Sequence, residues 1–522
     1  MKAPCEEAAI QSSPATGICL EAAEPWILAA AILGSSVAFI DSTVVNVALP
    51  ALQSSLGASV VDVQWVVESY SLFLAALILT GGSAGDLFGR RRMFLAGVSV
   101  FAIASAGCGL ARDIHQLLIA RAIQGAGAAF LVPGSLSIIS ASFAEEKRGR
   151  AIGTWSGFTA ITTAIGPVLG GWLIQHASWR WVFFINLPLA VAIVAMSLWR
   201  VPESRGNAGG YTDWPGALIA TVGLGGSVYG LLESARLTWN HPLVISSLII
   251  GVGCLTAFPF LEERTTFPMV PQSLFQSRTF SGANILTLFL YAAVGIFFFL
   301  FPLNLIQVQG YSPTATGAAA LPFILLMFVL SRWSGGLVTR YGPRLPLIVG
   351  PLIVAAGFVL LTIPSVGGGY WHTFFPSFVV LGLGMAVSVA PLTTVVMNAV
   401  GRERAGVASG VNNAVARMAG LLAIAVLGIV MVDTFSLRLD HNLKHVIVPD
   451  RARNELQSNR IQLGAMEIPA GIDWETAATI KNSIQQAFVF GFRMVMLICA
   501  ALSIASSICA WFMIGKEQRL RT

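Results

Sequence analysis

Two carboxylates and one guanidinium interrupt stretches of the chain that are otherwise apolar. Asp41 lies in AFIDSTVVNVALP, Glu68 in WVVESYSLFLAAL and Arg121 in LLIARAIQGAGAA. A charged side chain near the centre of a membrane helix costs roughly 2.5–3.5 kcal/mol, so each is a functional candidate that needs a partner or water. Carboxyl groups can take up and release protons. Burial raises the pKa of a carboxyl group and an adjacent guanidinium lowers it.

The bulk composition indicates the class of protein. Of the 522 residues, 55% are hydrophobic and 11% are charged, and the mean hydropathy is +0.76. A soluble fold cannot bury so much apolar surface. Apolar runs of about 20 residues, enough to cross roughly 30 Å of hydrocarbon, recur along the chain. We therefore predict an all-α polytopic membrane protein.

The apolar runs predict fourteen transmembrane helices, separated by short polar connections. Their expected bounds are 26–49, 62–82, 93–111, 115–140, 153–175, 182–199, 214–234, 242–261, 281–303, 315–333, 345–363, 372–396, 407–431 and 485–514. Alternate connections and the C-terminal end hold seventeen lysines and arginines, against three in the short connections on the other side. Because basic residues stay on the cytoplasmic side, both termini are expected in the cytoplasm.

This topology places the three charged residues at similar depth. Asp41 lies nine residues before Pro50, where the first span ends, which corresponds to roughly 13 Å at the helical rise. Glu68 and Arg121 lie about 9 Å inside spans that enter from outside, by the same rise. We expect Asp41, with Glu68 as a second candidate, to carry protons, and Arg121 to compete with the proton for the carboxylate. The alternative is a permanent polar lock that only fixes helix packing.

The connection between the second and third spans, GGSAGDLFGRRRMF, concentrates charge and glycine. Its candidate residues form a conformational latch at the cytoplasmic side: Gly82, Asp86, Gly89, Arg90 and Arg91. We expect Asp86 to cap the next helix or to bond to a neighbouring segment, and the two arginines to pair with acids such as Glu145 or Glu146. Breaking such a latch would shift the balance between inward-open and outward-open states.

Two motifs recur at nearly one offset. SRWSGGLVTRYGPRL repeats the loop pattern 253 residues later, pairing Gly82 with Gly335 and Gly89 with Gly342, and GVASG at 406–410 repeats GRAIG at 149–153 after 257 residues. These matches indicate a duplicated unit of six spans. Two spans of the fourteen are then an insertion.

The repeat predicts a domain organisation. The expected parts are a cytoplasmic N-terminal tail (1–25), a six-helix bundle (26–200), two inserted transmembrane helices (201–265), a second six-helix bundle (266–515) with a long external loop (436–485), and a cytoplasmic C-terminal tail (516–522). The external loop contains segments of helical character. In transporters built from such repeats, the substrate site lies near the midplane between the halves.

In these features the sequence resembles the major facilitator superfamily, specifically its branch of fourteen-helix drug/proton antiporters. The motifs stand in family order: DSTVVNVALP, GSAGDLFGRRR, LIARAIQGAGAA, AIGPVLGGWL and WRWVFFINLP. The resemblance covers residues 26–515 and implies the major facilitator fold. The sequence departs from the family pattern at Leu87, Thr162, Glu68 and, in the second copy of the loop, Thr339.

Small residues are expected to form the surfaces along which helices move. Gly125 in the fourth span, and Gly166, Gly170 and Gly171 around Pro167 in the fifth, allow backbones to approach closely in lipid. Pro167 also removes one helical hydrogen bond. By resemblance, AIGPVLGG is the antiporter motif of export-directed members. Tight packing without directional meaning is the alternative.

We therefore expect a proton-coupled efflux transporter of the cell membrane that exports small amphipathic or cationic compounds by alternating access. Export of one specific metabolite, lipid or sugar is the alternative within transporters. A membrane enzyme or sensor is less expected, and the six histidines are scattered without the metal-ligand spacing that an enzyme site could show. No GxxxxGK[ST] phosphate loop occurs, which disfavours a self-powered pump. The expected partners are the small-molecule substrate, protons and the lipid bilayer, with no nucleic acid, cofactor or metal; the sequence names no accessory export protein.

Overall fold

The fold is helical throughout the part of the chain that the computed structural model describes. These residues are 17–143, 145–205, 213–266, 268, 270–367, 369–400, 405–444, 446, 448–469 and 472–515. Lipid offers no hydrogen-bond partner to the backbone, so long apolar segments satisfy their N–H and C=O groups as helices. Polar side chains start several helices: Asp113 accepts a hydrogen bond from the backbone of Gln116, and Asp473 accepts one from Thr476. The latter bond lowers the pKa of Asp473.

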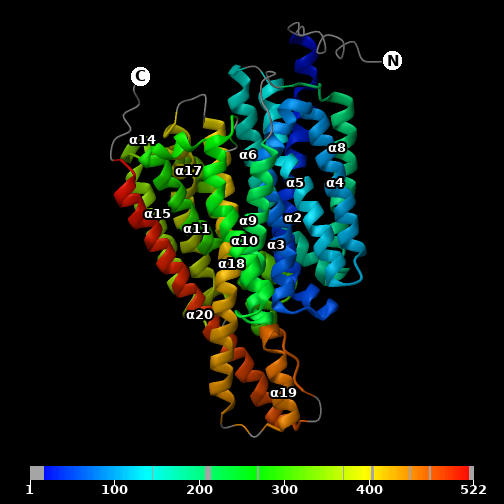
Figure 1. Cartoon of the computed structure of the whole chain (residues 1–522), viewed down its shortest axis with the longest axis vertical. Coiled ribbons are helices and arrows are strands. Elements are labelled where there is room, and N and C mark those ends of the chain that lie inside the picture. Colours follow the sequence, from blue (N-terminus) through cyan, green and yellow to red (C-terminus); the bar gives the residue numbers. More distant parts are fainter. Residues whose placement is uncertain are drawn as a thin grey trace. The chain divides into compact units, whose positions relative to one another are not determined.

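Residues cluster by contact into two compact units, which are described separately. Unit 1 holds residues up to Val45, Val66–Leu224 and Cys254–Pro271, and unit 2 holds Asn46–Trp65, Gly225–Gly253 and Gln272 onward. The helices of unit 1, some of which continue into unit 2, are α2 (Gly17–Leu56), α3 (Val60–Phe88), α4 (Arg90–Leu110), α5 (Ile114–Ser142), α6 (Glu145–His176), α7 (Trp181–Phe184), α8 (Asn186–Arg200), α9 (Trp214–Leu237) and α10 (Pro242–Arg264). Figure 1 labels most of them.

Unit 2 contains the remaining helices. They are α11 (Arg278–Leu303), α12 (Pro313–Ala319), α13 (Leu321–Gly335), α14 (Leu337–Tyr341), α15 (Arg344–Leu360), α16 (Tyr370–Thr373), α17 (Phe375–Asn398), α18 (Ala405–Leu443), α19 (Asp450–Ser458) and α20 (Trp474–Met513), with short turns η1 (Gln272–Gln276), η2 (Asn304–Val308) and η4 (Arg460–Ala465).

The expected all-α membrane protein is confirmed. Within the described residues, twelve helices are long and apolar enough to cross a membrane. The two other predicted spans coincide with α6 and with the 17-residue apolar helix α15. The exact number of fourteen crossings stays a prediction.

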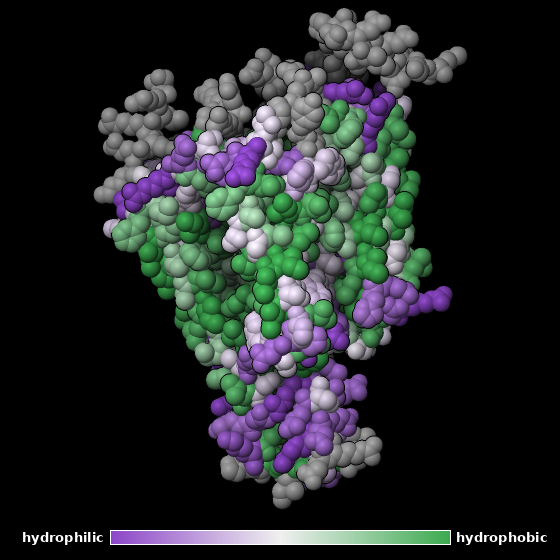
Figure 2. All heavy atoms as spheres, in the orientation of Figure 1, coloured by the Kyte–Doolittle hydropathy of each residue, from purple (hydrophilic) through white to green (hydrophobic). Residues whose placement is uncertain are grey.

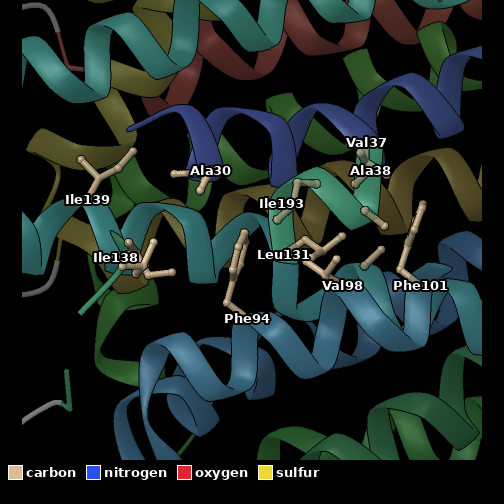
Figure 3. Packing of buried hydrophobic residues seen from close by; sticks show 14 of the residues in the cluster. Ala30, Val37, Ala38, Phe94, Val98, Phe101, Leu131, Ile138, Ile139 and Ile193 are labelled. Atoms are coloured by element: carbon tan, nitrogen blue, oxygen red, sulfur yellow. The ribbon is translucent and has the colours of Figure 1, made fainter. Parts of the chain in front are cut away.

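An apolar cluster holds unit 1 together. Figure 3 shows Phe94 and Phe101 of α4 beside Leu131 of α5, Val37 of α2 and Ile193 of α8. Each of these five side chains is at most 2% exposed. At about 25 cal/mol per Å² of buried apolar area, such side chains contribute roughly 1.5–3 kcal/mol each relative to an exposed position. The cluster fixes α2, α4, α5 and α8 relative to one another.

The long helices α18 and α20 explain the polar connection near the C-terminus. At 39 and 40 residues they would each extend close to 60 Å, about twice the hydrocarbon thickness. The second part of α18, the first part of α20 and α19 form a hydrophilic lobe in unit 2 (Figure 2). A side-chain ion pair between Arg460 and Asp440 links η4 to α18 there. The predicted helical character of this segment is confirmed.

The internal repeat appears as matching backbone contacts. A Cβ added to Gly127 of α5 would lie 2.7 Å from the backbone nitrogen of Phe101, and one added to Gly384 of α17 would lie 2.6 Å from that of Val354. Gly127 and Gly384 are related by the offset of 257 residues, and Phe101 and Val354 by the offset of 253. The packing of α5 on α4 is therefore repeated by α17 on α15.

The loop glycines of the two copies also match. Gly89 has a φ angle of 108° and Gly342 one of 75°, a region that other L residues rarely adopt. Each ends the helix before it and lets the next helix start after a sharp turn. The offset of 253 residues that the sequence suggested is thereby present in the backbone.

The close approach of α4 and α5 yields a prediction for stability. We expect Gly127→Ala to lower the apparent midpoint of thermal unfolding of the purified protein, because a methyl group would overlap the backbone of Phe101 and overpacking costs about 1–3 kcal/mol. Gly153→Ala is the matched control, since nothing lies within 4 Å of a Cβ at that helical position. The control should be neutral or slightly stabilising. A Gly127→Ala midpoint equal to that of the control would contradict the packing.

Candidate functional site

The centre of the site is a buried ion pair. Arg121 Nη1 of α5 donates to Asp41 Oδ2 of α2 over 2.6 Å. The side chain of Arg121 is 1% exposed and that of Asp41 is 0% exposed. Taking two such charges out of water costs several kcal/mol per ion, which only a close and well hydrogen-bonded geometry offsets. The predicted pairing of these two residues is therefore present within unit 1.

The second oxygen of Asp41 is held by two amides. Gln124 Nε2 donates to Asp41 Oδ1 over 2.9 Å, and Asn186 Nδ2 donates to the same oxygen over 3.2 Å. Ser105 joins both amides, because its hydroxyl accepts from Gln124 at 3.2 Å and from Asn186 at 3.0 Å and donates to the Phe183 carbonyl. Three donors from two other helices thus stabilise the carboxylate.

The guanidinium has further partners. Arg121 Nε donates to the backbone oxygen of Val66 over 3.0 Å, and Nη1 also donates to Gln124 Oε1 over 2.7 Å. Its carbon lies 4.2 Å from the centre of the Tyr70 ring, a distance at which a cation is attracted to the ring face. Arg121 consequently connects α5 to both α2 and α3.

Glycines permit this approach of helices. A Cβ at Gly125, one helical turn after Arg121, would collide with the carbonyl of Tyr70, whose carbon lies 2.9 Å from that position. A Cβ at Gly166 would collide with the side chain of Thr43, two residues after Asp41 along α2, and one at Gly170 would lie 2.6 Å from Cγ1 of Val44, three residues after Asp41. Small residues therefore bring α5 against α3 beside the ion pair, and α6 against α2 in the next turn after Asp41. Pro167 and Gly171 are buried within the same stretch of α6.

Glu68 is buried in α3 but is separate from this network. Its side chain is 0% exposed, and neither carboxylate oxygen has a hydrogen-bond partner. Residues separated by two positions in a helix point about 200° apart. Glu68 therefore faces away from Tyr70, which packs on Arg121. The structure thus joins two of the three expected charges and leaves the third without a hydrogen-bond partner.

The loop between α3 and α4 is fastened to the segment after α8. The Arg91 backbone donates to Glu203 Oε1 over 3.1 Å, its Nη1 donates to the Val201 carbonyl over 3.0 Å, and Arg90 donates from its backbone to the Ser204 carbonyl over 2.9 Å. Arg91 and Arg92 also lie 3.8 and 3.7 Å from Glu203 Oε2. Among the described residues, Glu203 is therefore an acid that lies beside these arginines.

The remaining latch residues are only partly described. A Cβ at Gly82 would lie 3.7 Å from Pro133 Cβ of α5, which is an ordinary contact. Gly89 lies against Glu203, because a Cβ there would be 2.9 Å from the carboxyl carbon. The side chains of Asp86, Glu145 and Glu146 are outside the described residues, so their expected bonds remain predictions.

Sequence reasoning missed part of the site. Ser105, Gln124 and Asn186 are neutral polar residues, to which the sequence alone assigns no role at the site. A signal exists for Gln124, since it follows Arg121 by three residues and so shares its helix face. Asn186 stands alone within the apolar run FFINLPLAV. Among the described residues, no group of three His, Cys, Asp or Glu side chains is placed to hold a metal ion.

Comparison with known proteins agrees with this architecture. Residues 31–424 match the family described as the Major Facilitator Superfamily. The chain is 34% identical to the multidrug resistance protein Stp of Mycobacterium tuberculosis, over 92% of this chain and 90% of that protein. It is 31% identical to the tetracenomycin C resistance and export protein of Streptomyces glaucescens, over 97% of this chain and 94% of that protein.

A solved structure supports the fold independently. A bacterial homolog of the human lysosomal transporter Spinster, in an inward-facing and unoccupied conformation, superposes with a TM-score of 0.62 at 18% sequence identity, over 94% of this chain and 98% of that one. Two helical repeats, a buried charge pair between the first and fourth long helices, and the match along three quarters of the sequence lead to one conclusion: the chain is a multi-pass membrane protein that belongs to the Major Facilitator Superfamily.

Proposed function

We propose that the protein is an efflux transporter, which moves small amphipathic or cationic compounds out of the cell in exchange for protons. The relatives named for multidrug resistance and for tetracenomycin C export support the direction and the class of substrate. The observation that carries the proposal is the buried pair of Asp41 and Arg121. Each proton that enters down a membrane potential supplies roughly 2.3 kcal/mol per 100 mV.

The ion pair provides a chemical route for coupling. When Asp41 takes a proton, its charge is lost and the attraction to Arg121 falls. Arg121 then keeps the Val66 carbonyl and Gln124 as hydrogen-bond partners, so it can move away from Asp41 without becoming a buried charge that lacks a partner. Since Asp41 belongs to α2 and Arg121 to α5, protonation changes the interaction between these two helices. We propose that this change biases the exchange between inward-open and outward-open states.

Glu68 is proposed as a second proton-binding group. Its environment within the described residues contains no donor that would stabilise a negative charge, and a buried charge without a partner is costly. The neutral, protonated carboxyl group fits this environment. A positively charged substrate that reached Glu68 would supply the missing partner and displace the proton.

The loop between α3 and α4 is proposed as the latch of one access state. Gly82, Asp86, Gly89, Arg90 and Arg91 are its candidates, and the hydrogen bonds of Arg91 to Glu203 and Val201 support it. Glu203 follows α8, so opening the latch would release the segment after α8 from the start of α4. A change of about 1.4 kcal/mol in this balance alters the populations tenfold.

Replacing Asp41 tests the coupling. We expect Asp41→Asn to reduce uptake of ethidium driven by a pH gradient into inverted vesicles at least about 10-fold, because the amide cannot carry a proton in exchange. Counterflow of ethidium without a gradient should persist, which shows that the variant is folded. Glu475→Gln, an exposed carboxylate in α20, is the matched control and should transport as the wild type does. Undiminished proton-driven uptake in Asp41→Asn would remove the proposed role.

Replacing Glu68 separates it from Asp41. We expect Glu68→Gln to leave the thermal midpoint unchanged or raised, since no hydrogen bond is lost, and to weaken the pH dependence of transport several-fold. Asp41→Asn should lower the midpoint, because it leaves Arg121 as a buried charge without its carboxylate. Thermal unfolding and transport at pH 6 and pH 8 measure both effects. An unaltered pH profile in Glu68→Gln would exclude its proton role.

The orientation is proposed from the distribution of basic residues, with both termini in the cytoplasm. In a variant without native cysteines, we expect a membrane-impermeant maleimide to label Glu475→Cys in intact cells, because α20 begins in the hydrophilic lobe. Thr522→Cys should react only after lysis. Labelling of Thr522→Cys in intact cells would reverse the proposed topology.

A further inference from the structure

A cavity in unit 2 lies where α18, α20 and the segment after α15 meet. Its volume is about 270 Å³, far more than the roughly 15 Å³ that one water molecule needs. Arg438 of α18 and Arg493 of α20 line it, together with Gln486, Ser365 and the apolar side chains of Val489 and Phe490. None of the described residues that line this cavity is acidic.

The two arginines carry positive charge that the described part of the chain does not neutralise. Neither Arg438 nor Arg493 forms an ion pair there. Arg493 Nη2 donates to the carbonyls of Ile363 and Pro364 over 3.3 and 3.0 Å, whereas its Nε is buried without a partner. Arg438 lies 5.3 Å from the centre of the Phe490 ring. Two like charges at one cavity repel each other, and an anion between them would remove that cost.

The bonds of Arg493 fix where the cavity lies along the helices. Ile363 and Pro364 follow the last turn of α15, which ends at Leu360. In the same connection, Trp371 is 68% exposed, as expected of an aromatic ring at the boundary between lipid and water. The cavity is therefore at the level of lipid headgroups. Arg493 is fixed there by two carbonyl groups rather than extended freely into water.

The exposed side of α20 connects the cavity with the hydrocarbon region. Phe490, Leu497, Ile504 and Ile508 are between 37% and 52% exposed. Their spacing of seven, seven and four residues places them on one face of the helix, and Arg493 lies between the first two along the chain. A molecule with a charged head at Arg493 and an apolar tail would find an apolar surface along this face.

We propose that this cavity binds the phosphate group of a membrane lipid. Arg438 and Arg493 donate to the phosphate oxygens, because guanidinium groups match phosphate geometry with paired hydrogen bonds. Gln486 and Ser365 add neutral donors, and the acyl chains lie along the exposed face of α20. The bound lipid would hold α18, α20 and the connection after α15 together. A free phosphate ion offers the same head chemistry without the apolar part.

Native mass spectrometry of the purified protein tests the proposal. With a short-chain phosphatidylglycerol, we expect a saturable bound lipid whose affinity falls about 10-fold in Arg438→Gln, since one charge-assisted contact is lost. Diacylglycerol, which lacks phosphate, should not bind at this site, and inorganic phosphate alone should not displace the lipid at equal concentration. Equal displacement by inorganic phosphate would overturn the lipid and assign the cavity to a free anion.

Two further variants keep the result interpretable. Ser365→Trp should reduce lipid binding by filling the cavity while leaving both arginines in place. Arg112→Gln removes an exposed arginine outside this cavity and should bind lipid as the wild type does. Retention of wild-type lipid affinity in both Arg438→Gln and Ser365→Trp would refute the site. Ethidium transport measured in parallel is independent of this result, so failure of the lipid site leaves the proposed exporter untouched.

Discussion

The requirement that no charge be buried without a partner organises unit 1. Asp41 and Arg121 are almost fully buried, and their attraction compensates the loss of water only because the remaining atoms of both groups are also hydrogen-bonded. The partners come from α3, α5 and α8, and Ser105 of α4 holds the two amides in place. Together with α2, which carries Asp41, five helices must therefore keep their positions around the pair.

The close contacts among these helices serve the same requirement. Arg121 reaches Val66 and Tyr70 because Gly125, on the same helix face, lets α5 approach the backbone of α3. The side chain of Arg121 is long, but a wider separation would leave its Nε without the Val66 carbonyl. The glycine of α5 thus sets the distance between α5 and α3 that the side chain of Arg121 has to span. The site requires both the glycine and the arginine.

The repeat shows that the scaffold does not itself require charge. Gly382 of α17 corresponds to Gly125 at the offset of 257 residues and packs against Phe323 of α13 as Gly125 packs against Tyr70. At the same offset, Arg121 corresponds to Phe378, whose ring lies 4.8 Å from Phe301 and 5.7 Å from Phe297 of α11. Unit 2 therefore fills with aromatic rings the position that unit 1 gives to an ion pair. Those phenylalanines belong to a buried core rather than to a lipid-facing surface.

The two units therefore differ in the chemistry of equivalent helix contacts, although their backbone architecture is duplicated. In unit 2, the contact between α11 and α17 consists of buried rings that hold the same interaction at any pH. In unit 1, the contact between α2 and α5 includes the ion pair of Asp41 and Arg121. Under the proposed coupling, a proton would change this contact and leave the ring contact of unit 2 unaltered.

Much of the fold followed from the sequence because lipid leaves few options. Long apolar segments in lipid must be helices, and the positive charge of alternate loops predicts their orientation. The helix positions and an expected depth for Asp41 and Arg121 could therefore be derived from the sequence. The lateral positions of these residues within the helix bundle could not be predicted. The predicted topology gives Glu68 the same depth as Arg121, but a rotation of about 200° between Glu68 and Tyr70 separates it from the pair. Depth contains no information about rotation around the helix axis.

The same limit applies to the polar residues that complete the site. Asn186 lies 145 positions from Asp41 in sequence, and only the packing of α8 against α4 brings the two together. Glu203 shares the cytoplasmic side with the loop arginines in the predicted topology, as do Glu145 and Glu146, so charge alone could not predict the contact with Glu203. That contact depends on the path of the chain after α8, where Ser204 accepts a backbone hydrogen bond from Arg90.

The contrast between the two buried carboxylates suggests how a single half could respond to both a proton and a cation. Three donors stabilise the ionised form of Asp41, whereas Glu68 has none. In the proposed mechanism, a proton on Asp41 would displace Arg121, which keeps its other partners, and this would link loading and release to helix movement. Glu68 would have no such competitor, so a proton or a positively charged substrate would serve as its partner. Coupling would then require no contact between the two groups, because both belong to helices that Arg121 connects.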